Sequence, residues 1–312
     1  MNFSRLLLTL AILANAGTNV EAETIFLSLW NKGQIVAADS GNWLPRTVLS
    51  GLVRPLGLDV DAVGQRIYFT QRTSWDSTVA KGLISRASLN GTNTETIATD
   101  LGSSFGPAVD ATGGKMYWWE FDEQRIRRAN LDGTASETLV VSSTAIGRGG
   151  SPVLDRDHGN IYWADQSTWS ICRASFSGQS PTVLSRAGSS GSCLSADFVA
   201  GNLYWSNIHS ILSSRLDGTG VRTVLSGLGQ VDYLTVDPSN SVMYYSVLTG
   251  SSGLSAIYRC NLDGTGNSQV FSVQGQVSGM VVSAVPEPST CAAALAGLAC
   301  VGYSLCRRGV RA

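Results

Sequence analysis

Two histidines are the first residues to consider for catalysis, because histidine is the side chain used most often as a general base. His158 lies in the run Asp157-His158-Gly159-Asn160, and His209 lies in the run Asn207-Ile208-His209-Ser210. Their spacing indicates no arrangement of a nucleophile, a base and a group that orients the base. We therefore expect His158 to be a solvated turn residue and His209 to be a loop residue, and we predict no catalytic residues.

Aspartates that recur ahead of short turns are the second candidates. They are Asp59, Asp110, Asp155, Asp197 and Asp237. Carboxylates around a central channel could hold the metal of a lactonase-like hydrolase. We favour a structural role, because an aspartate before a turn accepts a hydrogen bond from the backbone two residues on. The sequence contains no Asp-x-Asp-x-Asp-Gly calcium loop, and we predict neither a metal nor another cofactor.

Cysteines provide no clear framework. Cys291, Cys300 and Cys306 lie near the C-terminus, which leaves Cys172, Cys193 and Cys260 as an odd number in the interior. Cys172 and Cys193 could pair after export, but the distance between them cannot be deduced from sequence. Their pairing stays open.

Composition limits the classes of partner. The 312 residues carry a formal net charge of −1, and 14% are charged against a usual ~25%. Nucleic acids and anionic membrane surfaces attract clustered basic charge, so we predict no binding to nucleic acid. A hydrophobic fraction of 43% is sufficient for a folded core, and 34 glycines indicate frequent turns.

An aromatic doublet recurs through the interior of the chain. Its first aromatic residue falls at positions 26, 68, 117, 162, 204 and 244, so the intervals are 42, 49, 45, 42 and 40 residues. A short β-patterned run precedes each doublet after the first, and two further runs follow, often separated by Asn-Gly or Asp-Gly turns such as Asp132-Gly133. Four short strands at this period predict the blades of a β-propeller.

The two ends of the repeat region complement each other. The N-terminal part supplies strands at 25–28, 35–38 and 47–49 without a first strand, and 279–283 is a first strand without successors. Three strands plus one complete a sixth blade, so we predict a ring closed by the two ends, without exposed sheet edges. An open solenoid is the alternative, but its ends should carry polar caps.

The doublets and the residues after them resemble the YWTD motif of the LDL-receptor class B repeat, a family of six-bladed β-propellers. The resemblance covers about residues 24–284 and rests on the blade residues Tyr68, Tyr117, Trp118, Tyr162, Trp163, Asp165, Tyr204, Trp205 and Tyr244. In that family, the Asp at the fourth motif position forms hydrogen bonds between neighbouring blades. Here Asp165 alone keeps it; Gln71, Glu120 and Asn207 can still form hydrogen bonds, whereas Val247 and Leu29 cannot. Those last two junctions must depend on packing, and the family's ligand specificity does not carry over.

One face of such a propeller collects the loops between fourth and first strands and between second and third strands. Its candidate binding residues are Trp30, Trp75, Trp169, Arg54, Arg72, Arg148 and His209, with Trp43 as a further candidate. Exposed aromatic side chains beside arginine suit recognition of a peptide or glycan, because they combine contact area with hydrogen-bond donors. The alternative, that each tryptophan packs on its own blade, stays open.

The first 22 residues are typical of a secretory signal. Arg5 precedes the apolar run Leu6–Ala14, and small residues allow cleavage after Ala22 or Ala16. Export through the Sec machinery follows from this interpretation.

The last 28 residues combine three features of a sorting signal. Pro286, Glu287 and Pro288 precede an apolar run at 291–306, and Arg307 and Arg308 follow it. As a helix, this run extends about 24 Å, short of a ~30 Å hydrocarbon core. The order resembles the bacterial PEP-CTERM signal, which implies an exosortase as partner. A span this short suits transient insertion into the membrane better than a permanent anchor. A simple C-terminal anchor is the alternative.

Together these features predict an all-β, six-bladed propeller at 23–284, between a signal peptide at 1–22 and a sorting segment at 285–312. The predicted function is non-catalytic binding of protein or polysaccharide at the bacterial cell surface or in the extracellular matrix. The alternatives are a secreted metal-dependent hydrolase or lactonase on the same scaffold, and a purely structural matrix protein.

Overall fold

The computed structural model describes residues 23–76, 81–141, 150–165, 168–179, 181–186, 193–249 and 253–284. Thr24–Ser283 form one compact unit, and the second unit, Met1–Glu23 with Ala284–Ala312, lies almost entirely outside the described residues. Ala16, Ala22, Pro286, Glu287, Pro288, Arg307 and Arg308 therefore all lie outside them. Within the described ranges, no helix is long and apolar enough to cross a membrane.

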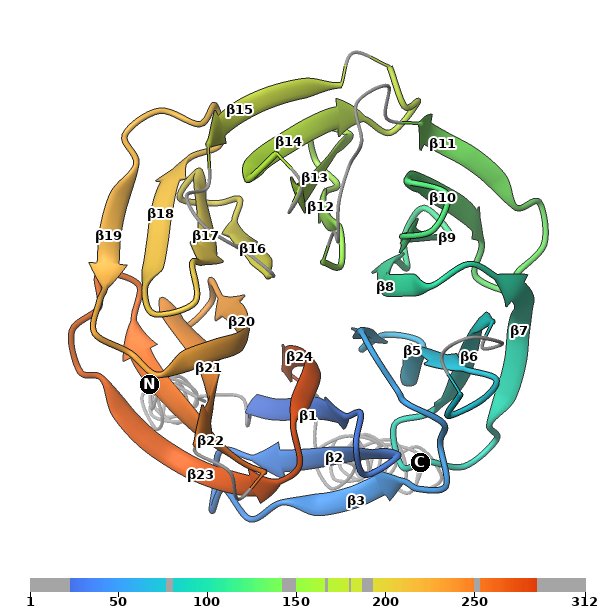
Figure 1. Ribbon diagram of the computed structural model, residues 1–312, viewed down its shortest axis with the longest axis horizontal. Helices are drawn as coiled ribbons and strands as arrows, with labels where there is room; N and C mark the ends of the chain where they lie inside the picture. Colours follow the sequence, from blue (N-terminus) through green and yellow to red (C-terminus); the bar gives the residue numbers. More distant parts are fainter. Residues whose placement is uncertain are drawn as a thin grey trace, which may run out of the picture. The chain divides into compact units, whose positions relative to one another are not determined.

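Six four-stranded antiparallel sheets form a ring around a central channel (Figure 1). From the channel outward, blade I consists of β24 (Val277–Ala284), β1 (Glu23–Leu29), β2 (Gln34–Asp39) and β3 (Arg46–Leu49). Blade II consists of β4 (Leu58–Asp61), β5 (Arg66–Arg72), β6 (Gly82–Ser88) and β7 (Glu95–Leu101). Blade III consists of β8 (Ser104–Asp110), β9 (Lys115–Glu120), β10 (Arg125–Asn130) and β11 (Glu137–Val141).

The remaining three blades repeat this plan. Blade IV consists of β12 (Val153–Asp155), β13 (Asn160–Asp165), β14 (Ser170–Ser175) and β15 (Thr182–Arg186). Blade V consists of β16 (Leu194–Asp197), β17 (Asn202–Ser206), β18 (Ile211–Arg215) and β19 (Arg222–Leu225). Blade VI consists of β20 (Gln230–Asp237), β21 (Val242–Thr249), β22 (Leu254–Asn261) and β23 (Ser268–Gln274). The all-β, six-bladed prediction is confirmed.

Blade I confirms that the two ends of the propeller close the ring. Its strand order, β24-β1-β2-β3, joins the last strand to the first three (Figure 1). The Ser278 hydroxyl lies 3.2 Å from the Ser28 carbonyl oxygen and 2.7 Å from that of Pro55. The indole N–H of Trp30 donates to the Gln276 side chain at 2.7 Å. Side chains as well as the backbone therefore hold the closure.

The aromatic doublets form the core between blades. Five of the six doublets pack their first residue against the next blade, because neighbouring residues of a strand point to opposite faces of the sheet. The resulting pairs are Tyr68 with Trp118, Tyr117 with Trp163, Tyr162 with Trp205, Tyr204 with Tyr245, and Tyr244 with Leu27. All of these side chains are at most 2% exposed. The doublet is thus an inter-blade contact repeated around the ring.

The fourth motif position behaves differently from blade to blade. The Gln71 side chain accepts a hydrogen bond from the backbone N–H of Val53, in the loop from blade I to blade II. Glu120 is fully buried and accepts hydrogen bonds from its own blade, including one at 2.7 Å from Arg125. Leu29 and Val247 are buried in apolar clusters, so packing replaces hydrogen bonding at those two positions.

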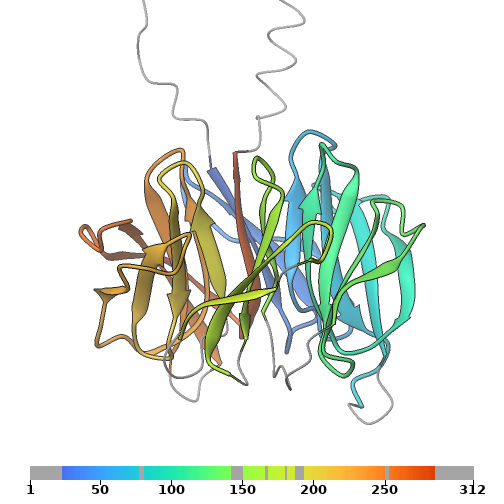
Figure 2. The same cartoon turned by 90° about the horizontal axis from the view of Figure 1, so that it is seen from above.

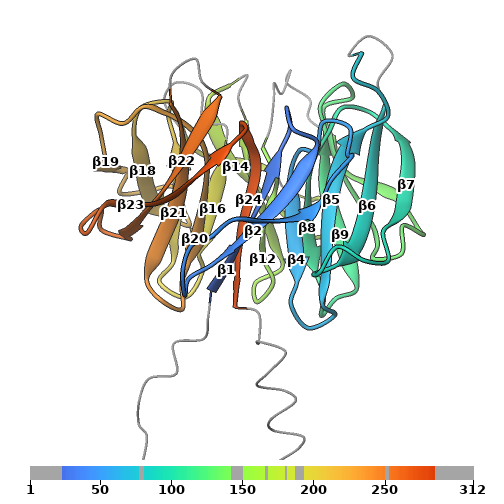
Figure 3. The same ribbon diagram turned by 90° about the horizontal axis from the view of Figure 1, so that it is seen from below.

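The ring has two distinct faces (Figures 2 and 3). We call the face with the loops that follow the second and fourth strands of each blade the top face, and the opposite face the bottom face. β1 begins and β24 ends on the bottom face, where both ends of the compact unit lie.

Candidate functional site

Trp30, Arg54 and Trp75 form a cluster on the top face. They come from the β1–β2, β3–β4 and β5–β6 loops, which the junction of blades I and II brings together. The Arg54 guanidinium carbon lies 5.4 Å from the centroid of the Trp30 ring and 5.6 Å from that of Trp75. A guanidinium over two indole faces is held by cation–π attraction. We call these three residues the Trp–Arg–Trp cluster.

Arg54 has unused capacity for hydrogen bonding. A guanidinium carries five N–H donors, yet that of Arg54 forms no hydrogen bond within the part of the chain that the structure describes, and its Nε is buried without a partner. Its backbone is in the left-handed region, with φ of 44°, a conformation that costs of order 1–3 kcal/mol in a non-glycine residue. The loop therefore maintains an oriented cation with free donors.

Neighbouring side chains support this loop. Gln71 holds Val53, the residue before Arg54, through the hydrogen bond between blades I and II. Arg72 donates to the Ser103 hydroxyl at 3.1 Å, so that arginine is engaged with blade III. Trp75 completes the cluster and remains 47% exposed. The arrangement offers a flat aromatic surface beside a cation, the combination enriched at binding hot spots.

Trp169 and His209 lie on the opposite side of the channel mouth, in blades IV and V. Trp169 is 42% exposed, with φ of 52°. His209 is exposed, and its Nδ1 lies 3.2 Å from the carbonyl oxygen of Leu228. Beside it, Ile208 adds an exposed apolar side chain, which the sequence did not indicate as a candidate. Arg148 lies outside the described residues. The predicted face therefore contains two separate groups rather than one.

The sequence placed Trp43 wrongly. It lies in the β2–β3 loop on the bottom face, where its ring stacks on Phe271 at 5.8 Å between centroids and tilts against Tyr244 at 5.7 Å. This tryptophan packs blade I against blade VI, so it belongs to the structure of the ring.

The aspartates that end the inner strands are structural, as expected, but Asp59 does not belong with them. Asp61, not Asp59, matches the others: its carboxylate accepts a hydrogen bond from the Gly64 N–H at 2.7 Å, three residues on. The equivalent bonds join Asp110 to Gly113, Asp155 to His158, Asp197 to Ala200, and Asp237 to Ser239. Only the last spans two residues, as predicted.

Asp59 instead connects two inner strands. Its carboxylate accepts hydrogen bonds from the N–H of Val109 in blade III at 2.7 Å and from its own neighbour Val60 at 2.8 Å. Ser195 does the same in blade V, accepting from Val236 of blade VI at 3.0 Å. Burial raises the pKa of Asp59, while the two backbone N–H groups and Arg156 oppose the rise.

The remaining chemical candidates have ordinary environments. His158 is a largely exposed turn residue whose Nδ1 lies 3.0 Å from Asp155. Cys172, Cys193 and Cys260 are buried free thiols, so the possible disulfide between the first two is not formed. Across the described ranges, no three His, Cys, Asp or Glu side chains lie where they could hold a metal ion together.

Comparison with known proteins supports the fold. No protein-family model matches the sequence. A chain in the crystal structure of a nidogen/laminin complex superposes with a TM-score of 0.70 at 20% identity, over 83% of this chain and 98% of that one. TolB from Acinetobacter baumannii superposes with a TM-score of 0.67 at 15% identity, over 84% of this chain and 66% of that one. At these identities the likeness shows the propeller fold alone.

Proposed function

We propose that this chain is a non-catalytic propeller that binds a protein partner through the Trp–Arg–Trp cluster on its top face. The observation that carries the proposal is Arg54, a cation oriented by two indole rings and without a hydrogen-bond partner among the described residues. Tryptophan and arginine dominate binding hot spots because they combine a large contact area with directional donors. The nidogen/laminin structure, a complex between proteins, contains a chain of similar fold.

The test measures saturable binding of the purified full chain to isolated bacterial envelope fractions, before and after protease treatment of those fractions. Arg54→Ala and Trp75→Ala should each weaken binding by about tenfold or more, the loss typical of a hot-spot residue. Val63→Ala is a matched control, because Val63 is 93% exposed on the bottom face. Protease treatment should abolish binding. Unchanged binding by the cluster variants would refute the proposed face, and protease-resistant binding would indicate a polysaccharide ligand.

We further propose that the chain is exported through the Sec machinery and sorted by an exosortase to the cell surface or matrix. Support comes from the signal-like residues 1–22 and from the order Pro286-Glu287-Pro288, apolar run, Arg307-Arg308. The end of β24 on the bottom face is compatible with attachment there, which would leave the Trp–Arg–Trp cluster accessible.

Deletion of 285–312 should release the protein into the medium. A Lys replacement of both Arg307 and Arg308 is the matched control, because it preserves the positive charge. If the truncated chain stays at the cell surface, the sorting proposal is wrong. Top-face binding can be assayed independently with the released protein.

A further inference from the structure

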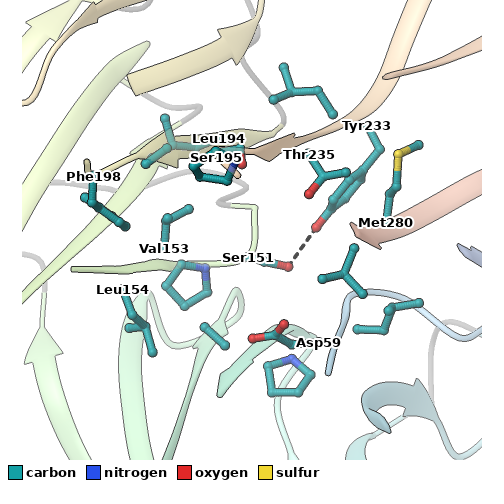
Figure 4. Close-up of a pocket in the computed structure, with 18 of the residues that line it drawn as sticks. Asp59, Ser151, Val153, Leu154, Leu194, Ser195, Phe198, Tyr233, Thr235 and Met280 are labelled. Atoms are coloured by element: carbon teal, nitrogen blue, oxygen red, sulfur yellow. Dashed lines mark hydrogen bonds between the residues drawn. The ribbon is translucent and has the colours of Figure 1, made fainter. Parts of the chain in front are cut away.

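A cavity of about 280 Å³ lies between the inner strands in the central channel. Figure 4 shows the side chains that line it. Its lining reaches the bottom loops at Arg156, Phe198 and Pro238. Toward the top face it ends at Tyr233, whose hydroxyl lies 2.8 Å from the Ser151 hydroxyl across the channel (Figure 4). The cavity is therefore separate from the Trp–Arg–Trp cluster, on the other side of this barrier.

The contact between Tyr233 and Ser151, which we call the barrier, lies where several inner strands approach one another closely. In blades II to VI the residue four positions before the aspartate that ends the inner strand is Gly57, Gly106, Ser151, Cys193 and Tyr233. In blade I the matching residue is Gly279, five positions before the end of β24. A Cβ on Gly57 would lie 2.6 Å from the Ser151 hydroxyl oxygen, and a Cβ on Gly279 would lie 3.0 Å from the Gly57 Cα. The glycines thus allow a closure that larger residues would prevent.

Two polar side chains in the cavity have unused hydrogen-bonding capacity. The Asp59 carboxylate accepts two backbone N–H groups, about half of what a carboxylate can accept. Thr235 is 7% exposed and lines the cavity, and its hydroxyl has no hydrogen-bond partner among the described residues. The walls around them are largely apolar, from Ala108, Val153 and Met280. The hydroxyl of Thr235 is therefore open to the cavity and available to a ligand there.

The charges at this end of the channel favour a cation. Five carboxylates end the inner strands: Asp61, Asp110, Asp155, Asp197 and Asp237. Arg156 is the cation in the described lining; it donates to the Val109 carbonyl and lies 3.7 Å from Asp110, and its charge also acts on Asp59, lowering the pKa of that carboxyl against the rise that burial causes. Negative charge around a low-dielectric opening raises the local concentration of cations.

We infer that this cavity binds a small organic ammonium ion, with Asp59 as its counter-charge and Thr235 as a hydrogen-bonding neighbour. An ammonium group has three donors to distribute between these two acceptors and the Ser195 hydroxyl, and a short alkyl chain fits the apolar walls. Calcium is a poorer match because it requires six to eight oxygen ligands, and no metal-holding group of side chains occurs in the described ranges. The cavity volume of about 280 Å³ lies just below the ~300–1,000 Å³ typical of pockets for drug-sized molecules, so it admits a small ligand such as a short diamine.

The test titrates the full chain with 1,4-diaminobutane at neutral pH and low ionic strength, by calorimetry. The matched probe is 1,4-butanediol, which has the same length and no charge. We expect one saturable diamine site and at least tenfold weaker binding of the diol, since a charge-assisted hydrogen bond contributes about 1.5–3 kcal/mol.

Two variants locate the site. Asp59→Asn should weaken diamine binding at least tenfold, and Thr235→Val should weaken it several-fold while the fold is retained, because that hydroxyl has no partner to lose. Val199→Ala, at an exposed position on the same face, is the control. Equal binding of diol and diamine, unchanged binding by Thr235→Val, absence of saturable diamine binding, or full displacement of the diamine by calcium would each overturn the inference.

Discussion

Gly57 lies where the inner strands close the channel, and its replacement by alanine tests that closure directly. A Cβ at this position would lie 2.6 Å from the Ser151 hydroxyl oxygen, 2.7 Å from the Gly106 carbonyl oxygen and 2.8 Å from the Gly106 nitrogen. Real Cβ atoms do not approach other heavy atoms this closely. Two of the three contacts are backbone atoms of blade III, so rotation of a side chain cannot relieve them.

The expected loss follows from this geometry. An extra methyl group in a well-packed core costs typically about 1–3 kcal/mol, and a clash with backbone belongs at the upper end, about 2–3 kcal/mol. For a domain of this size, one kcal/mol shifts the melting temperature by roughly 2–4 °C. Gly57→Ala should therefore lower the melting temperature by roughly 4–12 °C.

The assay is thermal unfolding followed by circular dichroism, with urea unfolding as a second measure. Gly41→Ala is the matched control, because a Cβ there has no heavy atom within 4 Å. Adding Ser151→Ala to Gly57→Ala should recover only part of the loss, since the contacts with Gly106 remain. A Gly57→Ala protein as stable as the Gly41→Ala protein would refute the close approach of the inner strands.

Three further predictions concern burial. Glu120→Ala should destabilise the protein by about 1.5–3 kcal/mol in urea unfolding, because the buried Trp118 indole and the partly buried Arg125 side chain lose their acceptor; a loss below about 1 kcal/mol would contradict this. Burial raises the pKa of the Cys172 and Cys260 thiols to about 12 and that of Cys193 to about 11, so iodoacetamide should label them at pH 8 only in denaturant. Because these folded-state pKa values lie above the ordinary 9, their contribution to stability is complete below pH 9 and is lost as the pH rises toward 12. Labelling of the native protein, or stability unchanged up to pH 12, would disagree. Trp43→Ala should cost about 3 kcal/mol in thermal unfolding and leave top-face binding unchanged; weaker binding by the folded variant would restore Trp43 to the binding site.

Much of the architecture is predictable from local pattern. The period of the doublets predicted the blades, and the complementary partial repeats at 25–49 and 279–283 predicted the closure that the β24-β1 pairing confirms. These predictions succeed because alternation along a strand and the period between strands are properties of the chain itself. The inter-blade pairing of doublet residues follows from the same alternation.

The chemical candidates were harder to place. Asp59 and Asp61 are two residues apart and equally acidic, and only their hydrogen bonds distinguish a bridge between blades from a turn residue. Trp30 and Trp43 both follow short strands of blade I, yet one lies on the top face and the other on the bottom. No sequence pattern indicated Thr235, because its role depends on a hydroxyl that lines the cavity without a hydrogen-bond partner among the described residues.

A closed ring of six four-stranded blades follows from the amino-acid sequence alone, since that ring is the repetition of one local pattern with matching ends. Tertiary structure decided which residues meet. Trp30, Arg54 and Trp75 come from three loops and touch only because blades I and II are neighbours. Asp59 and Thr235 face one cavity only because the inner strands converge, and the cavity ends where glycines let Tyr233 reach Ser151. Such contacts depend on distances between blades, and these distances cannot be deduced from the spacing of residues along the chain.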